Sequence, residues 1–254
     1  CVASLVLILL CFFLKKINLK ETFNYRYRLL LSSVFMMLHW VFFYQAIQAS
    51  SVSIGVISTF TYPLITALLE PFWLKKSYKI KLIFETIISL LGLYILLDFN
   101  NSNTNILQGI SWGVLAAFTF TLRNLISKPL LNKISSLWVM TCNVVLSALL
   151  LAPFCISILP SISFKNFILI SIAGILVSGI GHSLFLQSMQ SLPASLSSLF
   201  ATMQLPCAIL ASWLFLKEPI TPSILIGGSL ILGVVLFEQI SILYKQYLTS
   251  SNNV

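Results

Sequence analysis

The chain is a succession of apolar windows, each close to the length that an α-helix needs to cross a lipid bilayer. The windows cover approximately residues 29–49, 52–74, 82–99, 106–127, 135–158, 164–189, 194–216 and 221–243. A helix of about 20 residues spans roughly 30 Å of hydrocarbon, and backbone groups in lipid must pair internally. We therefore expect transmembrane helices. A further apolar stretch, residues 1–14, is too short to cross alone and is interpreted as the end of a helix.

Composition excludes an ordinary water-soluble domain. Only 8% of the residues are charged, where about 25% is typical of soluble proteins, and the mean hydropathy is +1.00. The five cysteines lie in or beside apolar windows and form no CxxC pair. The sequence therefore predicts neither a disulfide framework nor a zinc site, and no pattern indicates a cofactor.

The basic residues predict which side of the membrane each connection faces. Two of the fifteen, Lys165 and Lys217, lie on one side. The other thirteen lie on the opposite side: Lys15, Lys16, Lys20, Arg26, Arg28, Lys75, Lys76, Lys79, Lys81, Arg123, Lys128, Lys133 and Lys245. By the positive-inside rule the basic side is cytoplasmic. The net charge of +9 then indicates topology and attraction to anionic lipid, not a nucleic-acid partner.

The two halves of the sequence echo each other. The only two histidines, His39 and His182, lie midway along apolar windows, and each is followed 24 residues later by a proline, Pro63 or Pro206. The text FYQAIQASSVSIGVISTFTYP has a counterpart in FLQSMQSLPASLSSLFATMQLP. This pattern indicates an internal duplication.

The predicted topology makes the duplication an inverted one. Adding one upstream helix gives two sets of five, and an odd number reverses the second set. We predict an all-α integral membrane protein, a 5+5 inverted-repeat bundle with nine helices, the first partial, of an expected ten. The first repeat is residues 1–99 without its first helix, the second is 106–243, and 244–254 form a polar cytoplasmic tail.

Three strings resemble the EamA-type permeases of the drug/metabolite transporter superfamily. They are SSVSIGVISTFTYP, LLEP at Leu68–Pro71, and LFLKEPIT with the following IGGSLILGVVL. The resemblance implies a ten-helix transporter of small organic solutes with a central cavity and both termini cytoplasmic in the complete protein. This sequence departs from the family in lacking the first helix. It also has Lys75-Lys76 where the second repeat has Lys217-Glu218, so a role for that glutamate applies only to Glu218.

The histidines are the leading candidates to line the cavity, because polar residues at membrane depth are costly and often mark pathways. Gly174, Ser178 and His182 recur at a spacing of four, so His182 is expected to face a neighbouring helix. A neutral imidazole there could bind a solute or exchange a proton. The alternative is a packed histidine that bridges two helices.

Other candidates lie near the histidines and the prolines. Trp40 and Tyr44 are one turn apart and could stack on a planar solute, with packing or interface anchoring as the alternative. Tyr62 and Gln204 lie beside the prolines and could offer hydrogen bonds to a solute.

The prolines and one glutamate are candidates for movement and coupling. Pro63 and Pro206 are predicted to bend their helices and serve as hinges, with simple kinks as the alternative. Glu70, which precedes Pro71, is considered for proton coupling together with His39 and His182.

Three further patterns have mainly structural interpretations. Arg123 lies near a predicted helix end, so snorkelling to the headgroups is preferred over anion binding. Lys81 and Glu85 are predicted to pair across one turn. Close helix packing is expected along the stripe of Gly109, Gly113 and Ala117.

Together these features favour a secondary transporter working by alternating access in the cell (inner) membrane. Its partners would be a small solute and lipid, with proton coupling, direction and oligomeric state left open. A non-transporting membrane subunit is the alternative. A membrane-embedded enzyme is disfavoured, because there is no HExxH motif and Asp98 is the only aspartate. A channel is disfavoured for lack of a charged ring or carbonyl filter.

Overall fold

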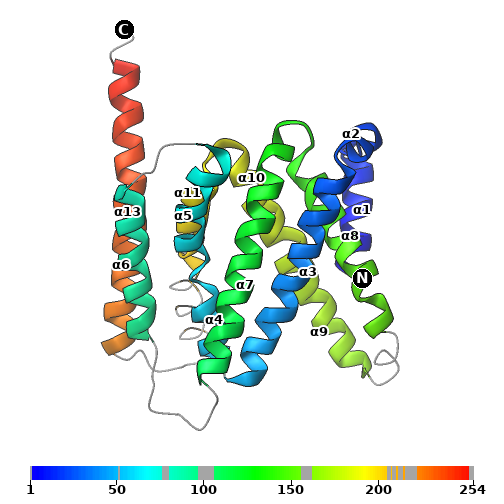
Figure 1. The fold of residues 1–254 in the computed structure, drawn as a ribbon, viewed down its shortest axis with the longest axis horizontal. Helices are drawn as coiled ribbons and strands as arrows, with labels where there is room; N and C mark the ends of the chain where they lie inside the picture. Colours follow the sequence, from blue (N-terminus) through cyan, green and yellow to red (C-terminus); the bar gives the residue numbers. More distant parts are fainter. Residues whose placement is uncertain are drawn as a thin grey trace.

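The computed structural model describes residues 2–50, 52–75, 80–96, 106–155, 162–204 and 222–251, together with Cys207, Leu210 and Leu214. Within these residues all regular structure is helical, which confirms the all-α prediction (Figure 1). The hinge candidate Pro206 and Glu218 lie outside the described residues.

The described helices follow the predicted windows closely. The first part of the chain forms α1 (Val2–Phe13), α2 (Leu19–Asn24), α3 (Arg26–Ala49), α4 (Val52–Thr59), α5 (Tyr62–Leu74) and α6 (Ile80–Leu96). The second part forms α7 (Ile106–Ser127), the 3-10 helix η1 (Lys128–Asn132), α8 (Ser136–Cys155), α9 (Phe164–Gly174), the π-helix η3 (Ile175–Gly181), α10 (His182–Ser191), α11 (Ala194–Ala201) and α13 (Pro222–Ser251). The last helix continues well past the predicted end at residue 243.

Four helical runs in the described chain are long and apolar enough to cross a bilayer. They are Arg26–Ala49, Leu107–Asn132, Ser136–Phe154 and Phe164–Ser191. These spans support a multi-pass membrane protein. The total of ten helices and the inverted arrangement of two repeats stay predictions.

The window 52–74, predicted as one bent helix, is two helices. Pro63 has no N–H to donate to the Thr59 carbonyl, so the α-helical bond at that point is missing. The backbone tightens instead, and both the N–H and the Oγ1 of Thr61 donate to the Ser58 carbonyl, at 3.3 and 2.8 Å. Pro63 therefore lies in the first turn of α5, where proline is well accommodated, and not in mid-helix.

The window 164–189 is interrupted by a π-helix. Residues Ile175–Gly181 have this wider geometry, and His182 begins the α-helix that follows. The predicted face of Gly174, Ser178 and His182 assumed continuous α-helical spacing, which does not hold across a π-helix. In this segment Gly179 is the buried residue.

The small-residue stripe on α7 allows the close packing that the sequence predicted. Helix α7 lies against α3, α4 and α5 (Figure 1). Ala117 is fully buried, and a Cβ added to Gly109 or Gly113 would overlap the side chain of Ser50 or Ser58. Larger residues would hold these helices apart.

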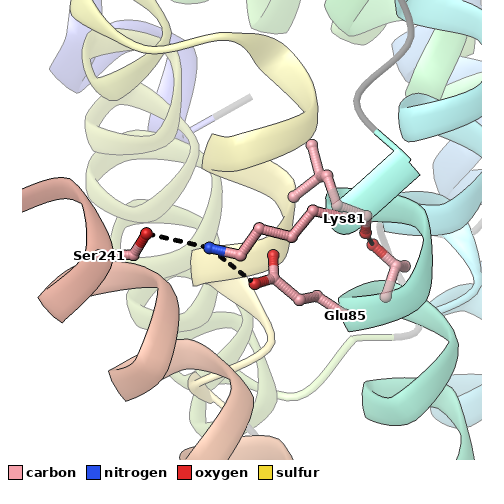
Figure 2. A network of polar contacts seen from close by, with 5 residues as sticks. Lys81, Glu85 and Ser241 are labelled. Carbon is pink, nitrogen blue, oxygen red and sulfur yellow. Dashed lines mark hydrogen bonds and ion pairs between the residues drawn. The ribbon is translucent and has the colours of Figure 1, made fainter. Parts of the chain in front are cut away.

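Helices α6 and α13 pack side by side (Figure 1). A Cβ on Gly92 would lie 2.8 Å from the Gly227 carbonyl oxygen, so the two backbones approach closely. Figure 2 shows the polar contact at this pair, where the Nζ of Lys81 lies 3.3 Å from Glu85 and donates to Ser241 at 3.0 Å. The predicted pairing of Lys81 with Glu85 is confirmed.

Candidate functional site

The ring of Phe120 on α7 is the centre of an aromatic cluster. His39 from α3 lies 4.7 Å from it between ring centroids, and Tyr62 from α5 lies 4.9 Å away. His182 and Phe185 from α10 each lie at 5.6 Å. The structure thus brings both histidines and Tyr62 onto one buried ring.

His39 is held in one orientation by the backbone of α7. It is 6% exposed, and its Nδ1 lies 3.0 Å from the Ala116 carbonyl oxygen. A carbonyl can only accept, so Nδ1 carries the proton and donates it. In the neutral ring Nε2 is then an acceptor. His39 bridges two helices, and this geometry does not by itself give it a role toward a solute.

His182 differs from His39 in having a ring nitrogen without a hydrogen-bond partner in the described chain. Its Nε2 is buried and has no hydrogen-bond partner within the described chain. The ring is half-buried and meets Trp40 edge-on, at 5.6 Å between centroids. A buried polar atom without a partner is costly, so this nitrogen is a candidate to meet a ligand.

Trp40 and Tyr44 form the open flank of the cluster. Their rings stack at 6.0 Å, and Tyr44 is 56% exposed whereas Trp40 is half-buried. Tyr62, in contrast, is buried against Phe120. Gln204 is exposed, and no contact places it in this cluster.

Arg123 does not snorkel, and that preferred interpretation was wrong. Its side chain is fully buried, with Nη1 donating to Asn124 Oδ1 at 2.8 Å and Nη2 to the sulfur of Met140 at 2.9 Å. The guanidinium carbon lies 5.8 Å from the centroid of Phe120. Helical structure continues through η1 to Asn132, so Arg123 lies deeper than the predicted helix end implied.

A set of polar contacts joins α3 to α8. The Oδ1 of Asn143 accepts hydrogen bonds from Ser32 and Ser33 at 2.7 and 3.1 Å, and Ser147 donates to the Ser33 carbonyl at 2.9 Å. These residues were not predicted as part of a site. An asparagine in the middle of an apolar window was the signal that could have revealed them.

Glu70 binds the N-terminus of α11. Its carboxylate accepts hydrogen bonds from the backbone N–H groups of Ala194 and Ser195, each at 2.8 Å, and from the Ser195 hydroxyl. This is a capping arrangement supplied by another helix. Proton coupling by Glu70 stays a prediction.

Lys128 in η1 binds the C-terminal end of α10. Its Nζ donates to the carbonyl oxygens of Met189 and Leu192, at the C-terminus of α10.

The described residues contain no group of three His, Cys, Asp or Glu side chains that could hold a metal ion.

Two grooves border α1 and lie away from Phe120. One, of about 540 Å³, lies between α1, α2, α3 and α8. The other, of about 440 Å³, lies between α1, η3, α10 and the start of α8. Neither is lined by His39, His182 or Tyr62.

Comparisons with known proteins indicate similarity to transporters. The sequence profile of the EamA-like transporter family matches residues 1–98 and 107–237. A protein described as the uncharacterized transporter YxxF of Bacillus subtilis (strain 168) is 26% identical over 186 residues, which are 71% of this chain and 59% of that protein. One solved crystal structure superposes with a TM-score of 0.75 at 14% identity, over 92% of this chain and 82% of the other, a likeness of fold alone.

Proposed function

Since the chain belongs to the EamA-like transporter family, we propose that this membrane transporter is a secondary carrier of small organic solutes that works by alternating access. Family members are transporters, which agrees with the expectation that the protein is not an enzyme. The finer proposal depends on the cluster around Phe120, where residues from both family-matched segments meet.

The position of this cluster supports a solute site. His39 and Tyr62 come from the segment 1–98, and Phe120 and His182 come from the segment 107–237. Carriers built from repeats bind their solutes near the bilayer midplane, at the interface between repeats. The uncommitted Nε2 of His182 and the half-exposed stack of Trp40 on Tyr44 offer a polar contact and an aromatic face for a solute.

Two irregular helices support movement of one part of the bundle against the other. The break before Pro63 removes a backbone bond between α4 and α5, and the π-helix η3 loosens the segment that leads to His182. We therefore keep Pro63 as the hinge candidate in the described chain. The same movement would open a cavity beside Phe120 toward one side and then toward the other.

Accessibility of Tyr44 tests this proposal. We would place Tyr44→Cys in a chain whose native cysteines are replaced by serine, reconstitute it, and apply an impermeant maleimide from either side. Alternating access predicts labelling from both sides, in a ratio that changes when a transported solute is added. Labelling from one side only, unchanged by any solute, would favour a non-transporting subunit instead.

A further inference from the structure

The guanidinium of Arg123 is a buried positive charge without a counter-ion in the described chain. Among the described residues it donates hydrogen bonds to the amide oxygen of Asn124 and to the thioether of Met140. A thioether is a weak acceptor, and Nε has no partner in the part of the chain that the structure describes. A buried charge of this kind is strongly unfavourable in a low-dielectric interior unless an anion lies beside it and neutralises it.

Two acidic side chains of the described chain are engaged elsewhere. The carboxylate of Glu70 is bound by the N-terminus of α11, and Glu85 is paired with Lys81 on α6. Glu21 lies in the short helix α2. None of these groups neutralises Arg123.

Two further hydrogen-bond donors near Arg123 lack acceptors within the described residues. They are the amide nitrogens of Asn124 and Asn143, and both side chains are fully buried. Asn124 accepts a hydrogen bond from Arg123. Met140 also accepts one from Arg123, and Asn143 lies one turn further along α8 than Met140. An excess of buried donors around a cation is the arrangement that an anionic ligand would satisfy.

From these contacts we infer that Arg123 binds the negative charge of the transported solute, and that the solute is an organic monocarboxylate with an aromatic or similarly apolar body. This inference rests on the proposed function, because it names the substrate class of the same site. The carboxylate lies along the edge of the guanidinium formed by Nε and Nη2, where Met140 now supplies only a thioether.

The rings beside Arg123 accommodate the rest of such a solute. Arg123, His39 and His182 all lie against the ring of Phe120. A solute bound there would have its carboxylate at the guanidinium and its apolar part against the aromatic cluster. The unpaired Nε2 of His182 would supply a second polar contact.

The charge at the site favours a monocarboxylate over a phosphate ester. A single guanidinium balances a single negative charge, and its planar fork matches a carboxylate in bidentate geometry. The nearest basic residue along the same helical run, Lys128, is bound to the end of α10. A doubly charged phosphate would therefore be only partly neutralised.

Matched pairs of ligands test the inference in the unmodified full chain. We would compare phenylacetate with phenylacetamide, and indole-3-acetate with indole-3-acetamide, by thermal unfolding of the purified protein. Phenyl phosphate serves as the doubly charged probe. At about 100 times its Kd, a bound carboxylate should raise the Tm by roughly 5 °C or more, and its amide should not. The assignment would be overturned if the carboxylates raised the Tm no more than their amides do, or less than phenyl phosphate does.

Variants of Arg123 locate the effect. R123Q should abolish the preference for the carboxylate, and R123K, which keeps the charge but not the fork, should weaken binding by about tenfold or more. The exposed Arg28 provides a control, and R28Q should behave as the native chain does. If R123Q does not fold, R123K and the matched ligand pairs still test whether Arg123 binds the carboxylate. Unchanged carboxylate affinity in R123K would contradict the role of Arg123.

Failure of this inference is distinguishable from failure of the proposed function. A carrier that takes neutral solutes would still show Tyr44→Cys labelling from both sides, but without any carboxylate preference. A protein that does not carry solutes would show labelling from one side only. The two measurements together therefore separate the substrate class from the transport mechanism.

Discussion

Glu70 and Lys128 bind opposite sides of a single turn, the one that joins α10 to α11. The carboxylate of Glu70 receives backbone N–H groups at the start of α11, and the ammonium of Lys128 donates to carbonyls at the end of α10. Each charge complements the dipole of the helix end that it binds. The turn is thereby fixed to α5 on one side and to η1 on the other.

Replacing Glu70 by Gln should destabilise the protein without disordering the fold. The amide keeps one acceptor oxygen, so one N–H of α11 loses its partner, at a cost of about 1–3 kcal/mol. The Tm should fall by roughly 2–4 °C for each kcal/mol. Glu21→Gln in α2 is the control and should change little.

The same variant tests proton coupling. If Glu70 carries the coupled proton, E70Q proteoliposomes would still exchange solute but would not accumulate it in response to a pH gradient. A capping role alone predicts instead that accumulation falls only in proportion to the loss of folded protein. Loss of pH-driven accumulation at normal exchange would contradict a purely capping role.

The two histidines should respond differently to substitution. His39→Ala removes a buried donor from the Ala116 carbonyl and should cost about 1–3 kcal/mol of unfolding free energy. His182→Ala removes no hydrogen bond within the described chain, so transport should fall by tenfold or more with a smaller change in stability. Normal transport in both variants would reduce the histidines to packing residues.

Close packing of α7 against α4 can be tested with paired glycines. Gly113→Ala places a Cβ onto the side chain of Ser58, whereas a Cβ on Gly233 of α13 meets nothing within 4 Å. We expect Gly113→Ala to lower the Tm, because overpacking costs about 1–3 kcal/mol. Gly233→Ala should leave the Tm unchanged or raise it. Equal behaviour of the two variants would argue against a tight α7–α4 contact.

The predicted topology can be checked at two exposed lysines. The described connections that carry most of the basic residues, at α2, at the end of α5 and at η1, lie at one end of the molecule in Figure 1. A cysteine at Lys165 should react with an impermeant reagent from outside the cell, and one at Lys133 should react only after permeabilisation. The reverse pattern would refute the orientation.

Helix positions were predictable from the sequence because apolar length alone nearly determines them. The window 106–127 coincides with α7, and 135–158 nearly coincides with α8. The break at Phe60-Thr61 and the π-helix at Ile175–Gly181 were not predicted, because window hydropathy contains no information about backbone hydrogen bonds. Pro63 indicated a bend but not that the helix would restart there.

The candidate site was predicted only in part. His39, Trp40, Tyr62 and His182 do come together, since buried polar and aromatic residues in lipid gather inside the bundle. Arg123 was misjudged, because its depth depends on η1 extending the helical run beyond the apolar window. The central position of Phe120 was not predicted, because an apolar window places an aromatic residue along a helix without indicating which ring the other helices meet.

The π-helix that precedes His182 lets this part of the chain absorb the smallest possible change in length. A π-helical turn holds one residue more than an α-helical turn, because its hydrogen bonds run from i to i+5. Deleting one residue within Ile175–Gly181 would therefore let the backbone return to ordinary α geometry and leave α10 in nearly its present orientation, with His182 still against Trp40. The helix of His39 runs without such an interruption, so the same deletion there would turn every later side chain by about 100°. The half of the site that contains His182 thus tolerates a change in length that the half that contains His39 does not.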